Sequence, residues 1–256
     1  MQIIAVTQAR LGSSRFPNKV LKKIGSKSLL EIHLHRIKKC KIISELIVAT
    51  TLETRDNEIE LLSKKLEISC FRGLENDVLD RYYNAVKKKK PSYVVRITSD
   101  CPLVDPNLID MIVNYTINNN LDYCSNTLED SYPNGQDIEV FRFSALENAW
   151  LNAKLNSERE HVTPYIKKNS SYLGGSKFKS DNIKLENDIY SKVRITVDEP
   201  CDFEVVKALV QDLGIDSGWK EYSDLYLSSK KIHSLNSKII RNEGYIKSLK
   251  NDFICE

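Results

Sequence analysis

Three cations and a glycine follow the first apolar run of the sequence. Residues 3–6 read Ile-Ile-Ala-Val, which is typical of a buried strand. The loop after it contains Arg10, Gly12, Ser13, Ser14, Arg15 and Lys19. Guanidinium groups match phosphate oxygens in pairs, lysine adds a compact charge, and glycine lets backbone N–H groups approach an anion. The pattern therefore predicts a phosphate-binding loop, with a basic surface loop as the alternative.

The spacing of this loop excludes two common nucleotide motifs. Gly12 has no second or third glycine at the offsets of a Walker A loop or of a dinucleotide-binding fingerprint. Its position directly after a strand still favours a ligand site, because open α/β sheets bind ligands beyond the carboxyl ends of their strands. Spacing alone thus predicts an anion site without naming the anion.

Two aspartates each follow a run of β-branched residues and precede a proline by two positions. Asp100 follows residues 93–98, and Asp198 follows residues 192–197, which we also expect to form a strand. Mg²⁺ is bound in proteins through one or two carboxylates together with substrate phosphates and waters. Either aspartate alone could instead cap the segment that follows it. Together with the basic loop, the two carboxylates predict a site for a metal ion and a triphosphate.

Composition and charge narrow the possible functions. The 256 residues are 41% hydrophobic and 29% charged, as in ordinary globular proteins, and the net charge of +3 does not indicate a nucleic-acid partner. Residues 87–90 are four lysines, which we interpret as the solvated end of a helix. The six cysteines include no Cys-x-x-Cys pair, so neither a zinc site nor a disulfide framework is expected. No apolar run approaches the ~20 residues of a membrane span, and we expect a cytoplasmic protein with no membrane partner.

Strand and helix patterns alternate through the first half of the chain. Apolar runs suited to strands occupy residues 3–6, 46–50, 68–71 and 93–97, and amphipathic helical patterns occupy residues 28–39, 56–66, 78–86 and 107–118. A turn at residues 133–135 precedes an alternating strand, and residues 157–166 read as a helix. The alternation predicts an α/β fold in which helices cover both faces of a mainly parallel sheet.

The order of residues in these motifs resembles the cytidylyltransferase family of spore coat polysaccharide biosynthesis protein F. That family is related to the enzymes that make CMP-Kdo and CMP-sialic acid. The resemblance is carried by residues 9–21, 72–83, 93–106, 159–163 and 192–204, and it extends to residues 242–249. It implies a three-layer α/β/α nucleotide-diphospho-sugar transferase (GT-A/Rossmann-like) fold with an inserted β-hairpin.

The resemblance also implies an organisation for the chain. Residues 1–256 would form a single cytidylyltransferase domain. Within it, a nucleotide-binding half would cover about residues 1–125, acceptor-binding and dimerisation elements about 126–190, and C-terminal helices about 201–256. We therefore expect a homodimer.

Roles for individual residues follow from the same resemblance. The catalytic groups would be Arg10, Arg15, Lys19, Asp100 and Asp198, with Mg²⁺ held by Asp100 and Asp198. Nucleotide binding would involve Ala9, Arg10, Gly12, Ser13, Lys19, Arg72, Asp77, Arg81 and Thr98, with Asp80 also beside the base. The acceptor would contact Asn134, Gln136, Glu139, Arg159, His161 and Arg194.

The implied reaction joins CTP to a small sugar acid, similar to Kdo or a nonulosonic acid, and releases pyrophosphate. The product would be a CMP-sugar for surface polysaccharide synthesis. The family usually has arginine or lysine where this chain has Asn134, and leucine or threonine where it has Gln136. These departures leave the identity of the acceptor open.

Three alternatives remain at this stage. A nucleotidyltransferase acting on a sugar phosphate or a phosphorylated alcohol would need the same nucleotide-binding residues. A metal-dependent glycosyltransferase would normally present Asp-x-Asp at its metal, whereas this chain has Ser-Asp-Cys-Pro at residues 99–102. A non-catalytic assembly partner would not need Asp100, Asp198 and the basic loop together.

Overall fold

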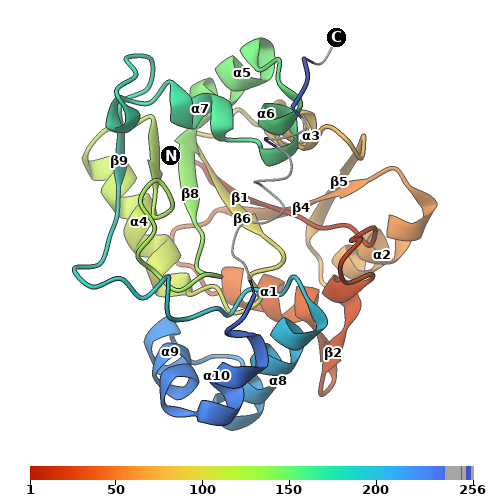
Figure 1. The fold of residues 1–256 in the computed structure, drawn as a ribbon. Coiled ribbons are helices and arrows are strands. Elements are labelled where there is room, and N and C mark those ends of the chain that lie inside the picture. Colours follow the sequence, from red (N-terminus) through yellow and green to blue (C-terminus); the bar gives the residue numbers. More distant parts are fainter. Residues whose placement is uncertain (240–248, 250–251, 255–256) are drawn as a thin grey trace.

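A seven-stranded sheet forms the centre of the molecule (Figure 1). The computed structural model describes residues 1–239, 249 and 252–254. The strand order is β5-β4-β1-β6-β8-β7-β9. The strands are β1 (Ile3–Gln8), β4 (Glu45–Thr51), β5 (Ser69–Gly73), β6 (Tyr93–Thr98), β7 (Tyr123–Ser125), β8 (Glu139–Arg142) and β9 (Ser180–Asn182). A separate antiparallel pair consists of β2 (Lys23–Ile24) and β3 (Lys27–Ser28).

Strand β1 lies between two parallel neighbours. It pairs with β4 on one side and β6 on the other, and β4 pairs in parallel with β5. Beyond β6 the direction changes, because β8 is antiparallel to both β6 and β7. The carboxyl ends of β1, β4, β5 and β6 therefore meet at one edge of the sheet, where ligands bind in folds of this kind.

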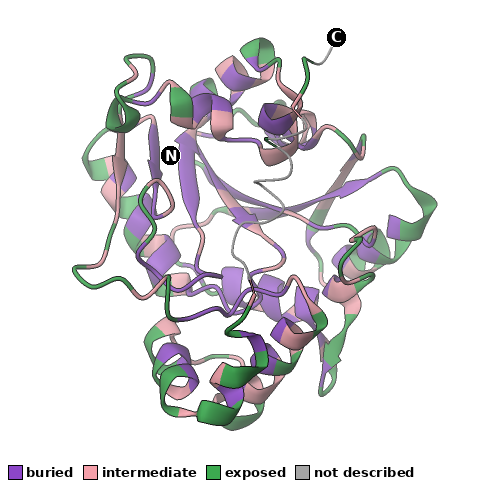
Figure 2. Cartoon of the chain, viewed as in Figure 1, coloured by how far each residue is buried: buried purple, intermediate pink, exposed green. Residues whose placement is uncertain are grey.

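Helices pack on both faces of the sheet, as the alternating pattern predicts. They are α1 (Leu29–Ile37), α2 (Asn57–Lys65), α3 (Val78–Val86), α4 (Pro106–Asn118), α5 (Phe143–Asn152), α6 (Asn156–His161), α7 (Pro164–Lys168), α8 (Pro200–Leu213), α9 (Trp219–Ser228) and α10 (Lys230–Asn236). Successive side chains of β1 point to opposite faces. Ile3 and Ala5 join the core formed with α1 and α4, whereas Ile4 and Val6 join the core formed with α3 and α5. Figure 2 shows the resulting buried centre and the exposed outer helix faces.

A third apolar cluster connects α8, α9 and α10 to the rest of the molecule. Leu29 and Ile32 of α1 pack there with residues 193, 195 and 197 and with α8–α10. These three helices lie together at one end of the molecule, drawn in blue in Figure 1. The cluster fixes the segment before α8, which contains Asp198, against α1.

Three local expectations need correction or refinement. Residues 192–197 were expected to form a strand, but they form an extended segment whose isolated bridge joins Arg194 to Asn134. The helix expected over residues 157–166 is split into α6 and α7, because Val162 has φ of 71° and Pro164 starts the next helix. The expected inserted β-hairpin corresponds to the antiparallel strands β7 and β8, which belong to the main sheet.

Three further expectations concern the cysteines, membrane spans and the C-terminal segment. The five cysteines in the part of the chain that the structure describes are all free thiols. No helix among the described residues is long and apolar enough to cross a membrane. The family-like segment at residues 242–248 lies outside the described residues.

Candidate active site

A polar cavity of about 660 Å³ lies at the carboxyl ends of β1 and β6. The last residues of these strands, Gln8 and Thr98, both line it. Its charged lining residues are Arg10, Arg15, Lys19, Glu75, Arg81, Arg96, Asp100, Asp137, Glu160, Arg194 and Asp198. Neutral residues that line it include Ala9, Ser13, Asn76, Asn134, Asn156, His161 and Phe253. Cations and carboxylates thus meet in one cavity large enough for a nucleotide.

The loop after β1 is fixed by contacts at both ends. The backbone N–H of Ala9 donates to the carbonyl of Ala49, at 3.2 Å, which extends the pairing with β4. The N–H of Leu11 donates to the buried carboxylate of Asp56, at 2.7 Å. Lys19 begins a short 3₁₀ helix at residues 19–21. A loop held in this way presents its side chains at the cavity wall without further ordering.

Lys19 joins the two aspartates that sequence spacing singled out. Its Nζ lies 2.9 Å from Asp198 Oδ1 and 3.8 Å from Asp100 Oδ2. Arg15 Nη2 also lies 3.2 Å from Asp198 Oδ1. Burial alone would raise the pKa of Asp198, but the charges of Lys19, Arg15 and Arg194 outweigh it and hold the pKa below the usual range. Asp198 is therefore an ionised carboxylate at neutral pH.

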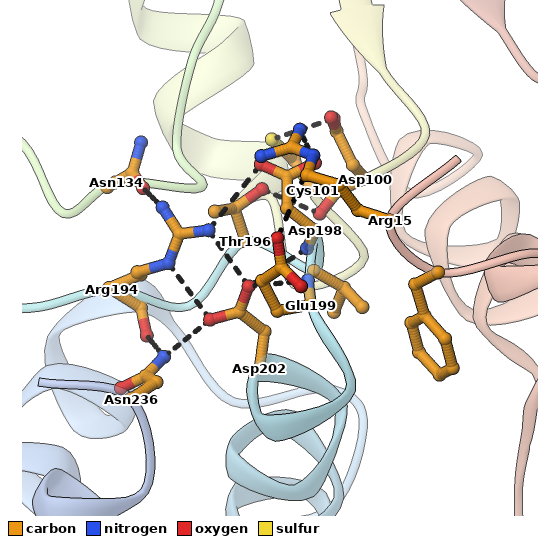
Figure 3. Close-up of polar contacts among 12 residues, drawn as sticks. Arg15, Asp100, Cys101, Asn134, Arg194, Thr196, Asp198, Glu199, Asp202 and Asn236 are labelled. Atoms are coloured by element: carbon orange, nitrogen blue, oxygen red, sulfur yellow. Dashed lines mark hydrogen bonds and ion pairs between the residues drawn. The ribbon is translucent and has the colours of Figure 1, made fainter. Parts of the chain in front are cut away.

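Arg194 and Asp202 form a buried clamp behind Asp198 (Figure 3). Arg194 donates from Nε and Nη2 to the two oxygens of Asp202, at 2.9 and 2.8 Å. Asp202 Oδ2 also accepts from the backbone N–H groups of Asp198 and Glu199, both at 3.0 Å. From α10, Asn236 donates to Asp202 Oδ1 at 2.8 Å and to the carbonyl of Arg194. The clamp fixes the backbone that carries Asp198.

Asn134 reaches the same clamp because Gly135 allows two segments to approach closely. Arg194 Nη1 donates to Asn134 Oδ1 at 3.0 Å. Gly135 has φ of +112°, and a Cβ atom there would lie 2.6 Å from the backbone nitrogen of Thr196. Any other residue at position 135 would therefore be strained and would push the segments apart.

A second buried ion pair lies beside the cavity. Arg96, on β6, pairs with the carboxylate of Glu139 on β8. Glu139 also accepts hydrogen bonds from Tyr123 and Thr163, both at 2.7 Å, and lies 3.0 Å from Lys167 Nζ. Burial would raise its pKa, but Lys167 and Arg96 lower it to about 2. Glu139 is thus a fixed negative charge that orients Arg96 at the cavity.

The pKa of Asp137 is raised, whereas that of Glu139 is lowered. Burial raises the pKa of its carboxyl to about 7, and the negative charges of Asp130 and Asp100 add to that effect. The N–H of Gly135 and the charge of Lys167 oppose it only in part. The cavity therefore contains both a firmly ionised aspartate and one that titrates near neutral pH.

The donor set at Asp100 and Asp198 suits Mg²⁺. No group of three or more histidine, cysteine, aspartate or glutamate side chains gathers into a complete metal cage within the described residues. Mg²⁺ does not require one, because it usually keeps several waters and takes one or two carboxylates together with substrate phosphates. Two carboxylates beside a basic loop match that arrangement.

Comparison with known proteins identifies the family. A family model described as Cytidylyltransferase matches residues 4–232. The chain belongs to the cytidylyltransferase family. It is 32% identical over 226 residues to the spore coat polysaccharide biosynthesis protein SpsF of Bacillus subtilis, which covers 83% of this chain and 88% of that protein.

Other relatives of this cytidylyltransferase are similar over different lengths. An uncharacterized protein of Methanocaldococcus jannaschii is 42% identical over 249 residues, covering 96% of this chain and 98% of that protein. A 3-deoxy-manno-octulosonate cytidylyltransferase of Bdellovibrio bacteriovorus is 35% identical over 115 residues, or 44% of each chain. The structure of a cytidylyltransferase from Leptospira borgpetersenii superposes with a TM-score of 0.84 at 32% identity, covering 94% of this chain and 98% of that one. The expected nucleotide-diphospho-sugar transferase fold is thereby confirmed.

Most residues expected to bind the nucleotide line the cavity of the cytidylyltransferase. These are Ala9, Arg10, Ser13, Lys19, Arg81 and Thr98. Arg72, Asp77 and Gly12 are not among its lining residues. Arg72 instead donates to Asn57 and Glu60, both at 2.7 Å, and so joins β5 to α2.

Asp77 and Arg159 lie together at a neighbouring cavity of about 800 Å³. Asp77 caps α3 by accepting the N–H of Asp80, at 2.8 Å, and its other oxygen accepts from Arg159 Nε, at 2.7 Å. Asp80 in turn accepts from Trp150 Nε1, at 2.8 Å. This chain of contacts joins α3 to α5 and α6.

Only some of the residues expected to bind the acceptor line the main cavity. Asn134, His161 and Arg194 line the main cavity, whereas Gln136 and Glu139 lie behind its wall. Gln136 is fully buried, where it accepts from the N–H of Asp105 and donates to the carbonyl of Leu103, both at 2.8 Å. Burial lowers the pKa of His161, so its imidazole is neutral at neutral pH.

Several lining residues were not predicted. Arg96 had a signal in the sequence, since it is a charged residue inside the otherwise apolar run 93–97. Asn76 lies in the loop after β5, whose polar groups were expected beside the base, whereas Asn156 and Phe253 had no signal because distant segments bring them to the cavity. Asp202 had no local signal either, because its clamp depends on contacts with residues 194 and 236.

Proposed function

We propose that the protein transfers CMP from CTP to a sugar acid and releases pyrophosphate, with Mg²⁺ bound at Asp100 and Asp198. One observation carries the proposal: Lys19 lies between these two carboxylates, 3.8 Å and 2.9 Å away, at the cavity that the basic loop lines. A triphosphate needs cations and a divalent metal at the same place, and this cavity offers the cations together with two carboxylates that would hold the metal.

The proposed reaction is an in-line displacement at the α-phosphorus of CTP. A hydroxyl oxygen of the acceptor forms a bond to phosphorus while the bond to the β-phosphate oxygen breaks, and the hydroxyl proton leaves to the surrounding solvent. Arg15 and Lys19 would hold the phosphates and stabilise the departing pyrophosphate. Mg²⁺, when bound, would neutralise charge on the triphosphate.

A carboxylate-bearing acceptor is supported by one group, the guanidinium of Arg96, which keeps one donor free in the described part of the chain although it also pairs with Glu139. Arg96 lines the cavity, and its buried Nε has no hydrogen-bond partner among the described residues. A buried donor without a partner carries a desolvation cost that an anionic ligand can relieve. The names of the SpsF protein and the octulosonate cytidylyltransferase support a sugar acid destined for a polysaccharide. We also propose that the protein forms a homodimer and is located in the cytoplasm.

Pyrophosphate release tests the proposal directly. The purified protein would be assayed with CTP, UTP, ATP and GTP in the presence of Mg²⁺, each with a panel of ulosonic acids and phosphorylated acceptors. A pocket that accepts a hydrogen bond from the cytosine amino group faces a carbonyl when UTP binds. That mismatch costs about 1–3 kcal/mol, so kcat/KM for CTP should exceed that for UTP by roughly tenfold or more.

The two halves of the proposal fail in different ways. Equal use of CTP and UTP would contradict the nucleotide assignment. Turnover with phosphorylated acceptors but not with ulosonic acids would contradict the sugar-acid assignment and leave the cytidylyl transfer standing.

A further inference from the structure

Residues 252–254 are attached to the start of α6 by specific hydrogen bonds (Figure 1). The N–H and the hydroxyl of Ser157 donate to the two carboxylate oxygens of Asp252, at 2.9 and 2.7 Å. The N–H of Asn156 donates to the carbonyl of Phe253, at 2.9 Å, and Ile254 forms a bridge with Leu155. These contacts fix the backbone at Phe253 and leave its side chain outside the core.

Phe253 lies where the two cavities meet. It lines both the main cavity and the neighbouring one, and 59% of the residue is exposed. Three other residues line both cavities, namely Glu75, Asn76 and Asn156. A large apolar ring on a fixed backbone at the wall of a polar cavity gains contact area only when something packs against it.

The neighbours of Phe253 suit a nucleobase better than a phosphate. The phosphate-binding cations Arg15 and Lys19 lie beside Asp198, which belongs to the segment before α8. Phe253 instead lies with the amide side chains of Asn76 and Asn156. Amides can donate to and accept from the edge of a base, and aromatic rings stack on the face of any base.

We propose that Phe253 is a nucleoside-binding residue, whose ring packs against the cytidine of the bound nucleotide at the junction of the two cavities. This inference rests on the proposed function, because it takes CTP as the ligand. It adds a binding residue that lies 176 positions or more along the chain from the loop after β1 and the loop after β5.

Equilibrium binding of CTP, without acceptor, tests the role of the ring. Phe253→Ala should raise the Kd for CTP roughly tenfold, while Phe253→Tyr should remain close to the wild type, because base stacking requires an aromatic face. The affinity for tripolyphosphate, which has no base, should be the same in all three proteins. Ile254→Ala is the matched control, since Ile254 is the next residue, is 70% exposed, and is not among the lining residues of either cavity.

The outcomes separate this inference from the proposed function. Wild-type affinity for CTP in Phe253→Ala would overturn the inference while CTP turnover by the wild type still supported the function. An equal loss of CTP and tripolyphosphate affinity would also overturn it, because the ring would then act on the phosphate end through the fold. If the wild type bound no CTP, both proposals would fall.

Discussion

The ammonium group of Lys19 lies 2.9 Å from a carboxylate oxygen of Asp198, a residue 179 positions away in the sequence. The same ammonium lies 3.8 Å from Asp100 Oδ2, and it also donates to the carbonyl of Val197 at 2.7 Å. The basic loop after β1 and the two carboxylates proposed to hold Mg²⁺ are thus parts of one charged cluster. Charge changes in that cluster should affect turnover more than folding.

Asp100→Asn and Asp198→Asn should each lower kcat by about a hundredfold or more. Both substitutions keep the shape of the side chain and remove a charge expected to hold Mg²⁺, and loss of one electrostatic contact in an active site typically costs a factor of about 10²–10³. Pyrophosphate release as a function of Mg²⁺ concentration measures the effect, with circular dichroism to check the fold. Glu204→Gln, at an exposed carboxylate on α8, is the control. Near wild-type turnover in either variant would remove that aspartate from the metal site.

Arg15→Ala should raise the KM for CTP about tenfold and change the KM for the acceptor little. Arg15 is one-third exposed at the cavity and lies 3.2 Å from Asp198, so its guanidinium is available to a phosphate. Lys23→Ala, at an exposed cation of β2, is the control and should leave both constants unchanged. An increase confined to the acceptor KM would show that the loop does not serve the nucleotide.

Local sequence signals predicted the parts of the site that depend on one strand and the loop after it. Asp100 and Lys19 could be predicted because each stands close to an apolar run that fixes its place. The strand expected before Asp198 was wrong, because the β-branched residues Val193, Ile195 and Val197 pack against α8 and α1 instead of pairing in the sheet. Propensity did not distinguish these two environments, since both bury alternate apolar side chains.

The other parts of the site could not be predicted from the sequence, because they depend on contacts between distant segments. Arg72 and Arg81 lie nine positions apart in one motif, yet Arg81 lines the cavity and Arg72 pairs with Glu60 of α2. Similarly, Asp202 joins the site through Arg194 and the backbone N–H of Asp198, and Asn236 of α10 donates a hydrogen bond to it. Such roles depend on which helix end packs beside which loop. The periodicity of the sequence does not predict this packing.

Asp202→Asn should destabilise the fold and weaken activation by Mg²⁺. Asp202 is fully buried, and removing its charge leaves Arg194 buried without its main partner. Breaking a buried ion pair by removing one member costs about 3–5 kcal/mol, and the asparagine would retain only some of the hydrogen bonds. Urea unfolding and Mg²⁺ titration of turnover measure the two effects. Asp212→Asn, at an exposed position of the same helix, should be nearly neutral, and a neutral Asp202→Asn would contradict the clamp.

Asp137→Asn should stabilise the protein increasingly as the pH rises from about 4 to 7. Burial, with Asp130 and Asp100, raises the pKa of Asp137 from 3.8 to about 7 in the folded state. Across that window the folded state keeps a proton that the unfolded state has lost, so the wild-type free energy of unfolding falls as the pH rises. The asparagine variant lacks this proton and its penalty.

Urea unfolding of both proteins at several pH values, in the presence of EDTA, measures the difference. It should be small near pH 4, grow towards pH 7 and stay constant above it. Asp188→Asn is the matched control, because hydrogen bonds from Ser191 lower the pKa of Asp188 and the carboxyl is ionised in both the folded and the unfolded state above about pH 5. The difference between Asp188→Asn and the wild type should therefore be flat. A flat difference for Asp137→Asn as well would show that this carboxyl is already ionised in the folded cavity at pH 4.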